Sequence, residues 1–314
     1  MQHDIWFNGR LIPHEDAKVH VLSHVVHYGS SVFEGIRCYD TARGSAVFRL
    51  QDHMRRLMDS AKIHRMMPRY DQAALEAAVL ETIQSSGLAS CYIRPVVMRG
   101  TGSLNVNPMH SEIDTFIAVL EWGAYLGEGS LESGINVQVA SWSRMAPNTH
   151  PAMAKGGGNY MNASLVKMDA VLNGYAEGIM LSVDGYLAEG SGENLFLIRD
   201  GVLFTAPRSL SILPGITRSS VIRLARDLGY EVVEELLPRE ALYIADELFF
   251  TGTAAEITPI RSVDKHTIGT GRRGPVTAEL QQAFFAIVRR GHDPYGWLTP
   301  VTARTEALAL DAVA

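Results

Sequence analysis

The chain has 314 residues, of which 46% are hydrophobic and 20% are charged, and its formal net charge is −6. This length is enough for two domains with sizeable cores. The excess of acidic residues argues against a nucleic-acid partner, because such a partner usually requires a basic patch.

Simple patterns bear on membrane association and on the redox compartment. The N-terminus has no basic segment followed by an apolar one, and no apolar run is long enough to cross a bilayer, so no membrane association is expected. The only two cysteines, Cys38 and Cys91, have neither the number for a disulfide framework nor the spacing of a metal site. We therefore expect free thiols and a cytoplasmic location.

Helix and strand patterns alternate along the first part of the chain. A hairpin is predicted over residues 4–12, because Asn8-Gly9 suits a tight turn. Helical spacing follows, and then two runs rich in Val and Ile that are typical of strands. The predicted helices are 52–63 and 71–86, and the predicted strands are 91–98 and 115–122.

A second unit begins after the glycine-rich stretch 123–130, which is the candidate linker. It contains two predicted hairpins, with turns at Asp184-Gly185 and Asp200-Gly201. Its other predicted elements are strands 135–142 and 247–251 and helices 159–173, 217–228 and 277–290.

Hairpins mixed with helices argue against a single doubly wound parallel sheet. A mixed α/β protein of two domains fits better, and the cleft between them is the default ligand site. We predict a small domain over residues 1–124, a linker over 125–134 and a large domain over 135–314.

Lys155 is followed by three glycines, Asn159 and Tyr160. The glycines remove the side chains next to the lysine, so a flat ligand could lie against the backbone. A lysine in such a place can lose its proton and attack a carbonyl group. The alternative is a solvated lysine in a flexible surface loop, and this segment alone does not decide between the two.

Three segments could bind a phosphate. Ile216 and Thr217 open a predicted helix, where free amides and the positive end of the helix dipole favour an anion, although Thr217 could be an ordinary N-cap. Thr253 follows a predicted strand and offers a hydroxyl and an amide, although this segment alone is more typical of a plain turn. Arg56 could bind a phosphate bidentately, although most helix arginines are solvated.

Glu189 and Glu193 lie among glycines in the segment 185–194. The glycines leave room for a carboxylate to approach a ligand, such as the protonated nitrogen of a pyridine ring. A solvated glutamate in a turn is the alternative.

Other patterns do not support a competing function. Residues 269–274 match the dinucleotide fingerprint, but Pro275 follows at once and leaves no room for the strand–helix–strand unit. His20, His24 and His27 could share a helix face, but no nearby carboxylate or cysteine completes a metal site, so no metal is expected. The chain has no Gly-x-Ser-x-Gly or Walker A motif, so the esterase and P-loop interpretations lack support.

Taken together, these segments resemble the branched-chain amino acid aminotransferases of bacteria, which are fold-type IV pyridoxal-phosphate enzymes. The resemblance extends from about residue 5 to about residue 297 and implies a two-domain architecture with the active site in the interdomain cleft. The motifs that carry it are Val19–His24, His27–Tyr39, Tyr92–Pro95, Trp122–Tyr125, Ala146–Thr149, Lys155–Tyr160, Glu189–Asn194, Leu213–Arg218 and Gly252–Pro259.

The resemblance implies a role for each cofactor contact. Lys155 would hold pyridoxal 5′-phosphate covalently and act as acid and base when released. Glu189 would face the pyridine nitrogen and keep it protonated, which strengthens the electron sink. The other implied contacts are Arg56, the amides of Ile216 and Thr217, and Thr253 for the phosphate, and Tyr160 for the phenolic oxygen.

The resemblance also implies an aromatic, apolar substrate pocket. Tyr92 and backbone donors at Thr253 and Ala254 would bind the α-carboxylate, and Arg94 would bind the distal carboxylate of glutamate. A movable arginine at the pocket edge would let one pocket accept both an apolar side chain and a carboxylate. The pocket walls would be Phe33, Trp122, Tyr125 and Tyr160, with Tyr28 and Val106 from a neighbouring subunit, so a homodimer at least is expected.

The implied activity is reversible amino transfer between leucine, isoleucine or valine and 2-oxoglutarate, giving branched 2-oxo acids and L-glutamate. Two departures from the family pattern bear on the site. Leu104-Asn105 stands where the family usually has Met-Gly before Val-Asn-Pro, which affects side-chain preference, and Gly156 stands where Ala is common.

Three other functions stay open at this point. A D-amino acid or (R)-amine transaminase shares the fold and differs mainly in pocket residues. An aminodeoxychorismate lyase also shares the fold, but that family lacks the Tyr-x-Arg strand motif at Tyr92 and the Trp-Gly-Ala-Tyr segment at Trp122. The third is a non-catalytic binding protein on this scaffold, and the presence of Lys155, Glu189 and Arg56 argues against it.

Overall fold

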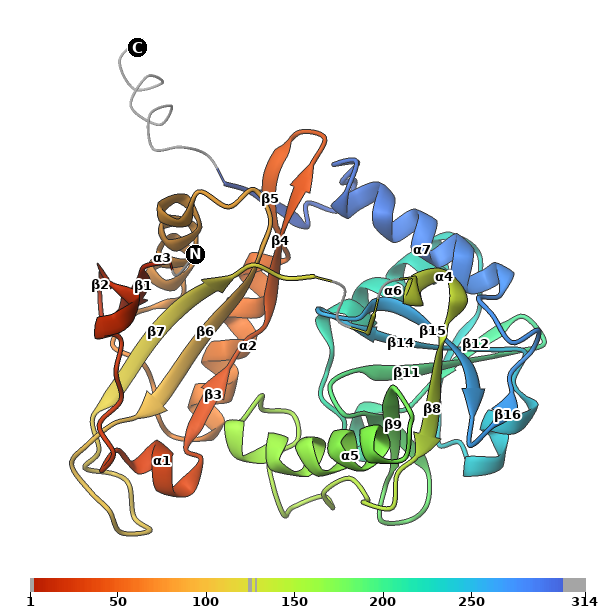
Figure 1. Ribbon diagram of the computed structural model, residues 1–314, viewed down its shortest axis with the longest axis horizontal. Coiled ribbons are helices and arrows are strands. Elements are labelled where there is room, and N and C mark those ends of the chain that lie inside the picture. Colours follow the sequence, from red (N-terminus) through yellow and green to blue (C-terminus); the bar gives the residue numbers. More distant parts are fainter. Residues whose placement is uncertain (1–2, 124–125, 128, 302–314) are drawn as a thin grey trace.

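The fold consists of two sheets that lie side by side, each covered by helices (Figure 1). The computed structural model describes residues 3–123, 126–127 and 129–301. We call the first sheet with α1–α3 the first lobe and the second sheet with α4–α7 the second lobe. The helices are α1 His24–Tyr28, α2 Leu50–Ile63, α3 Gln72–Ser86, α4 Ser130–Ser133, α5 Tyr160–Leu172, α6 Ile216–Asp227 and α7 Pro275–Val288.

The first sheet has the strand order β17-β5-β4-β6-β7-β1-β2, and β3 also pairs with β6. Every pairing in it is antiparallel. Its strands are β1 Ile5–Phe7, β2 Arg10–Ile12, β3 Ser31–Phe33, β4 Ile36–Thr41, β5 Gly44–Phe48, β6 Cys91–Arg99, β7 Ile113–Leu120 and β17 Leu298–Pro300.

The second sheet has the order β10-β9-β8-β15-β14-β11-β12-β13, with β16 paired to β15. It is mixed, because β8 runs parallel to both β9 and β15, and β12 runs parallel to β13. Its strands are β8 Ile135–Val139, β9 Glu177–Leu181, β10 Leu187–Gly190, β11 Asn194–Arg199, β12 Val202–Thr205, β13 Val232–Glu234, β14 Glu247–Gly252, β15 Glu256–Val263 and β16 His266–Thr267.

Local sequence explains where several elements begin and turn. Asn8 and Gly9 have φ values of 45° and 97°, the left-handed geometry that a two-residue hairpin turn needs. The Asp71 side chain accepts a hydrogen bond from the amide of Ala74 and so caps α3. Pro275 opens α7, where its missing N–H costs nothing. The hairpins and helices expected from the sequence are confirmed, with ends shifted by a few residues.

The proline in the centre of β6 has a matching break in its neighbours. The amide of Glu34 donates to the carbonyl of Pro95 at 2.9 Å, at the gap between β3 and β4. A proline cannot donate to a sheet ladder, and here the partner strand is interrupted at the same point. The interruption leaves Glu34 and Gly35 between the end of β3 and the start of β4.

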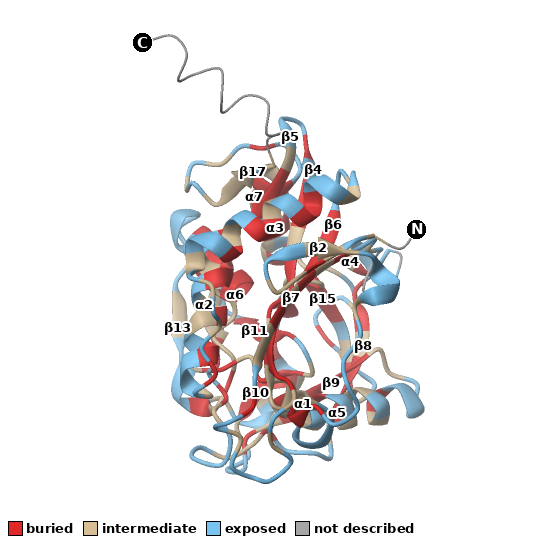
Figure 2. Ribbon diagram, turned by 90° about the vertical axis from the view of Figure 1, so that its left-hand side faces the viewer, coloured by how far each residue is buried: buried red, intermediate tan, exposed pale blue. Residues whose placement is uncertain are grey.

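The hydrophobic core crosses from one lobe to the other. Burial is concentrated on the strands and on the inner sides of the helices (Figure 2). One apolar cluster joins Tyr39 and Phe48 of the first sheet to Phe249 and Phe284 of the second lobe. β17 pairs with β5, so the last described strand belongs to the first sheet. The division into residues 1–124, 125–134 and 135–314 stays a prediction.

Several strands lie outside what the sequence predicted. No element was expected between residues 13 and 51, where β3, β4 and β5 form, and β13, β15, β16 and β17 were not predicted. β4 and β15 are buried on both faces over most of their length, so they lack the alternation that marks a half-exposed strand. Among the described residues, every helix is too short or too polar to span a bilayer.

Candidate active site

Lys155 is held by its backbone against the first lobe. Its amide donates to Ser60 Oγ on α2 at 3.0 Å, and its carbonyl accepts from the amide of Phe33 at 3.0 Å. Gly156 forms an isolated bridge with Val32. The lysine therefore lies where the loop before α5 meets α2 and β3, although all its sequence neighbours belong to the second lobe.

The three glycines after Lys155 allow this contact. A Cβ atom on Gly157 would lie 2.3 Å from Ser31 Oγ, and one on Gly156 would lie 2.9 Å from His64 Nε2. A side chain at Gly157 would force the loop or Ser31 to shift, whereas at Gly156 the His64 side chain could move aside. The sequence suggested that the glycines clear space for a flat ligand, but at Gly156 and Gly157 that space is filled by first-lobe side chains.

The amine of Lys155 has an aromatic rather than an ionic environment. Nζ donates to Tyr160 Oη at 2.7 Å and lies 5.1 Å from the ring centroid of Phe33. Within the described residues it forms no ion pair with a carboxylate. The amine is the group that can attack a carbonyl as a nucleophile.

A cleft between the lobes opens in front of this amine. Its lining brings together most of the residues predicted to contact substrate. They are Phe33, Gly35, Tyr92, Arg94, Trp122, Lys155, Tyr160, Gly192, Glu193, Thr253 and Ala254.

Arg94 lies at an aromatic corner of the cleft. Its Nη2 donates to Tyr92 Oη at 3.0 Å, and its guanidinium lies 4.7 Å from the ring centroid of Phe33. Arg94 Nε is buried and has no hydrogen-bond partner among the described residues. Tyr92 also stacks on Trp122, with ring centroids 4.4 Å apart. The corner thus combines a flat aromatic wall with the Arg94 guanidinium, which has at least one N–H donor without a partner among the described residues.

Two of the predicted substrate residues do not line this cleft, and a third, Tyr125, lies outside the described residues. Tyr28 is 47% exposed and Val106 is 82% exposed. Tyr28 Oη donates to the carbonyl of Leu104 at 2.9 Å, so both lie together on the outer surface near α1.

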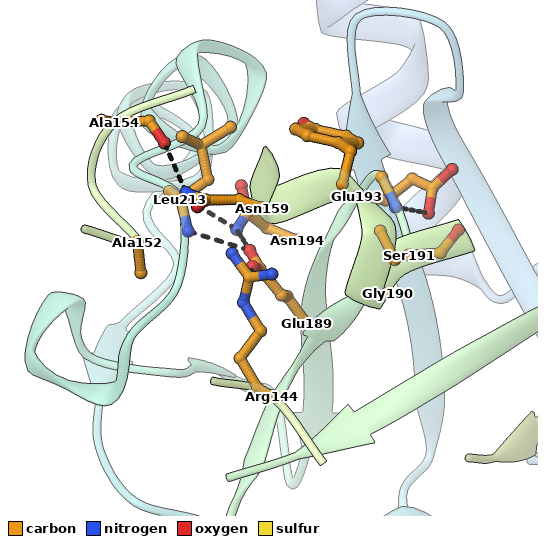
Figure 3. A pocket seen from close by; sticks show the side chains of 13 residues that line it. Arg144, Ala152, Ala154, Asn159, Glu189, Gly190, Ser191, Glu193, Asn194 and Leu213 are labelled. Carbon is orange, nitrogen blue, oxygen red and sulfur yellow. Dashed lines mark hydrogen bonds and ion pairs between the residues drawn. The ribbon is translucent and has the colours of Figure 1, made fainter. Parts of the chain in front are cut away.

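Glu189 lies in a second, adjoining cavity and is fixed by three partners (Figure 3). Its Oε1 pairs with Arg144 Nε at 2.8 Å, and its Oε2 accepts from Asn194 Nδ2 at 3.1 Å and from the amide of Leu213 at 3.0 Å. Burial raises the pKa of Glu189, and Arg144, the Leu213 amide and Lys155 oppose that rise.

Arg144 and Asn194 are functional neighbours that the sequence analysis did not assign. Arg144 is 6% exposed and also donates to the carbonyl of Ser211 at 3.1 Å. Asn194 Nδ2 donates to the carbonyl of Leu213 at 3.0 Å. An arginine buried at a carboxylate that lies far along the chain gives no local signal, so no pattern in the sequence could reveal this pair.

Arg56 marks the opposite end of the site. Its Nε and Nη2 donate to the two oxygens of Glu34 at 2.7 and 2.8 Å, and its Nη1 donates to the carbonyl of Pro214 at 2.9 Å. Glu34 is fully buried and also contacts His53 Nδ1 at 2.7 Å. Burial alone would raise the pKa of Glu34, but Arg56 and His53 outweigh it and hold that pKa well below its usual range.

The start of α6 lies beside Arg56 through the Pro214 contact. α6 is 12 residues long, and no side chain caps its N-terminus. The first amides of a helix have no intrahelical acceptor, so they favour an anion. Ile216 and Thr217 stand at this position, and both are buried.

One helix face therefore sets both ends of the site. Along α2, Arg56 points to the start of α6 and Ser60 holds the amide of Lys155. These positions are four apart and so lie on one face of a helix. Burial dominates the pKa shifts of His53 on α2 and of Glu189, and the charge of Lys155 contributes to both. The charge of the Lys155 amine thus acts on ionisable groups of both lobes, His53 in the first and Glu189 in the second.

The residues present fit a phosphorylated pyridine aldehyde. Such a group needs an amine, an anion site and an acceptor for a pyridinium proton. The uncapped α6 terminus with Arg56 could supply the anion site, and the buried Glu189 could supply the acceptor. The amine lines the cleft, and Glu189 lines the cavity that adjoins it.

The chain matches a known family and known relatives over most of its length. Residues 31–263 match the amino-transferase class IV family. The chain is 54% identical over 301 residues to a branched-chain-amino-acid aminotransferase of Salmonella typhimurium, and the match covers 95% of this chain and 97% of that protein.

Two solved structures have the same fold. The Escherichia coli branched-chain amino acid aminotransferase superposes with a TM-score of 0.94 at 53% identity, covering 96% of this chain and 100% of that one. The branched-chain amino acid aminotransferase of Thermobaculum terrenum, in its PLP-bound holo form, gives a TM-score of 0.89 at 34% identity, covering 96% and 99%.

Proposed function

This chain belongs to the amino-transferase class IV family, and from that membership we propose that it transfers amino groups between branched-chain amino acids and 2-oxo acids. It is a fold-type IV aminotransferase. Leucine, isoleucine and valine are the amino donors, 2-oxoglutarate is the acceptor, and the products are branched 2-oxo acids and L-glutamate. The observation that carries the proposal is the amine of Lys155, which faces the aromatic cleft that contains Arg94.

Pyridoxal 5′-phosphate is the cofactor, and when bound it supplies an electron sink for negative charge at the substrate α-carbon. Lys155 holds it covalently, and Tyr160 contacts its phenolic oxygen. The phosphate is held by Arg56, the amides of Ile216 and Thr217, and Thr253. The pyridine nitrogen faces Glu189.

Lys155 and Tyr160 handle the proton. When released from the cofactor, the Nζ of Lys155 would accept the proton of the substrate α-carbon as a base and later donate it as an acid. Tyr160 Oη, at 2.7 Å from Nζ, accepts a hydrogen bond from the amine and fixes its direction. General acid–base transfer by a positioned group contributes roughly 10²- to 10⁴-fold.

Glu189 would place a carboxylate beside the pyridine nitrogen of the cofactor, where a negative charge stabilises the protonated nitrogen. Arg144, Asn194 and the amide of Leu213 already hold the carboxylate in one orientation. It therefore needs no reorganisation to accept a proton-bearing nitrogen. Preorganised charge of this kind is more effective than a flexible side chain.

The cleft accepts two kinds of side chain. Phe33 and Trp122 provide apolar surface for a branched side chain, and the contribution of Tyr125 stays a prediction from the sequence. Tyr92 and the backbone at Thr253 and Ala254 bind the α-carboxylate. Arg94, whose Nε has no partner among the described residues, binds the distal carboxylate of glutamate.

The second copy of the chain completes the pocket. Tyr28 and Val106 are exposed and held together through the loop at Leu104. Val21 and Met109 add exposed apolar surface to the same region, at 71% and 58%. A patch of this kind marks an interaction site, and we infer that it inserts into the cleft of the neighbouring subunit in a homodimer.

The enzyme acts in the cytoplasm. Cys38 and Cys91 are register partners on β4 and β6, and both are free thiols. A chain with so few cysteines and no disulfide framework in its sequence is typical of a reducing compartment, and this supports the proposed location.

The activity is tested by mixing the purified chain, pyridoxal 5′-phosphate, leucine and 2-oxoglutarate. The expected products are 4-methyl-2-oxopentanoate and glutamate, followed by chromatography. Faster turnover of D-alanine or an (R)-amine than of L-leucine would favour the alternative transaminases, and absence of amino transfer at neutral to mildly alkaline pH would refute the proposal.

Lys155→Ala is expected to lower the rate by more than about 10⁴-fold, because the chain then lacks both its covalent anchor and its proton carrier. The visible absorbance of the bound cofactor, which borohydride removes from the wild type, should be absent from this variant. The matched control is Lys62→Ala, which removes an exposed lysine of α2. An equal loss in both variants would contradict the assignment.

A further inference from the structure

Glu193 is a buried carboxyl group that the mechanism does not use. It lies between β10 and β11, four residues after Glu189, and it lines both the cavity of Glu189 and the cleft of Lys155 (Figure 3). The residue is 5% exposed. Its Oε2 accepts from the amide of Gly192 at 3.0 Å, whereas its Oε1 is buried and has no hydrogen-bond partner among the described residues.

The charges around Glu193 do not balance. Three buried carboxyl groups lie near one another, but only two have a cation. Glu189 pairs with Arg144 at 2.8 Å, and Glu177, on β9, pairs with Lys167 of α5 at 2.9 Å. In the described part of the chain Glu193 forms no ion pair.

Arg94 and Lys155 line the same cleft as Glu193, and Arg144 lines the same cavity, but none of the three forms an ion pair with it. Glycine at position 190 leaves room for its carboxyl, since a Cβ there would lie 2.8 Å from Oε2 and 2.9 Å from the Phe250 ring. Gly252 of β14 would place a Cβ 3.4 Å from its Cγ. The surroundings are therefore glycine and aromatic carbon on β10 and β14, with ionisable groups on β6, β9, α5 and β10 and in the loops at Arg144 and Lys155.

An unpaired buried carboxylate is very unfavourable, so the carboxyl group takes up a proton instead. Burial chiefly, and then the negative charge of Glu177, raises the pKa of Glu193 to about 8, while the Gly192 amide and Lys167 oppose the rise. The group is neutral at pH 7 and ionises in mildly alkaline solution.

We propose that Glu193 is a positioning residue that acts in its protonated form and keeps the turn between β10 and β11 seated beside the cofactor. Loss of the proton places an uncompensated negative charge next to Glu177 and Glu189. The turn then moves towards solvent to hydrate that charge, and the grip on the cofactor weakens. The cofactor part of this inference rests on the proposed function, and the protonation part does not.

The sign of the stability effect follows from the direction of the pKa shift. The folded-state pKa lies above the value of 4.5 for a free glutamate. The folded state therefore binds more protons than the unfolded one between these values. Its contribution to stability is complete below about pH 4.5 and is lost as the pH rises through about 8.

Glu193→Gln mimics the protonated group at every pH. We expect its melting temperature to match that of the wild type at pH 5 and to exceed it by about 4 °C or more at pH 9. The wild type should bind pyridoxal 5′-phosphate about tenfold more weakly at pH 9 than at pH 7, because one proton is lost a pH unit above the midpoint. The variant should bind it equally well at both. Fluorescence titration measures the binding.

Glu177→Gln provides a second measurement. Removing the negative charge of Glu177 lowers the pKa of Glu193. In this variant the affinity for pyridoxal 5′-phosphate should therefore begin to fall at a lower pH than in the wild type. The matched control is Glu81→Gln, on the exposed face of α3, which should leave both profiles unchanged.

Two results would overturn the proposal. Parallel melting profiles for wild type and Glu193→Gln from pH 5 to 9 would show that the carboxyl is not protonated. If Glu193→Gln melts at a higher temperature than the wild type at pH 9 but its cofactor binding has the same pH dependence, Glu193 affects stability alone and does not position the cofactor. Failure to bind pyridoxal 5′-phosphate at any pH would instead refute the proposed function, and the melting profiles would still test the protonation.

Discussion

The two walls of the active site bury charge in opposite ways. On the first-lobe wall, Glu34 is matched by Arg56 and His53, and its pKa is depressed. On the second-lobe wall, carboxyl groups outnumber their cations, and the pKa values of Glu189 and Glu193 are raised. The carboxyl group of the first-lobe wall stays ionised, whereas the raised pKa values on the second-lobe wall favour the protonated form of its carboxyl groups.

This difference matches what each end of the cofactor requires. A phosphate keeps its negative charge throughout the reaction, so a permanently ionised arginine suits it. A pyridine nitrogen must be protonated, so it needs a carboxylate that can share a proton. The contrast shows that the same residue type, glutamate, is set to different charge states by the number of cations packed against it.

The largest effect on stability is expected when the buried ion pair between Glu34 and Arg56 is removed. Glu34→Gln removes one partner of a buried ion pair, which typically costs about 3–5 kcal/mol in the free energy of unfolding. Arg56 then loses its bidentate support, so cofactor affinity should also fall. Urea denaturation at pH 7 measures the first effect and fluorescence titration the second.

The pH dependence of unfolding in Glu34→Gln tests whether the two walls differ in how their carboxyl groups ionise. The contribution of Glu34 is present above the free glutamate value of 4.5 and is lost as the pH falls through its lower folded-state pKa. The gap between wild type and Glu34→Gln should thus be constant from pH 6 to 9 and narrow only in acid. A gap that closes in alkali would show that the walls do not differ.

An intermediate effect is expected at the ring end. Glu189→Gln keeps the shape of the side chain but removes the charge that we propose faces the ring nitrogen. We expect kcat for leucine to fall about 100-fold, which corresponds to about 2.7 kcal/mol of barrier. Glu231→Gln, at an exposed position of the second lobe, is the control. A loss smaller than about threefold would contradict the role of Glu189.

The smallest effect is expected at the loop that joins the walls. Gly156→Ala places a Cβ 2.9 Å from His64 Nε2, the far end of a side chain that can shift. The backbone there is extended, with φ −82°, so alanine fits it. Overpacking and reduced unfolded-state entropy nearly cancel, and we expect a change within about 1 kcal/mol by thermal denaturation.

Gly157→Ala is the sharper comparison within the same loop. Its Cβ would lie 2.3 Å from Ser31 Oγ on β3, and a strand residue has less room to move. This variant should destabilise the protein more than Gly156→Ala, and the reverse order would show that the loop is not seated on the first lobe.

The sequence predicted the segments that carry the chemistry but not their partners. Lys155, Arg56 and Glu189 stand out because their neighbours in sequence are unusual or because they match a known family. Glu34 gave no such signal, since it meets Arg56 only after the chain has passed through β4, β5 and the start of α2. Arg144 meets Glu189 in the same long-range way.

The fold shows the same limit. The hairpin at Asn8-Gly9 and the capped helix at Asp71 depend on local rules, and both were predicted. β4 and β15 are buried on both faces, so no periodicity distinguishes them. Glu256 opens β15 with a φ of 54°, a geometry that no propensity for a strand would suggest.

The chain passes between the lobes twice, once from β7 to β8 and again from α7 to β17. A body attached at one point can swing in any direction, whereas a body attached at two points turns easily only about the line that joins them. The two crossings, together with the apolar cluster that spans both lobes, restrict how far the two walls of the cleft can move apart.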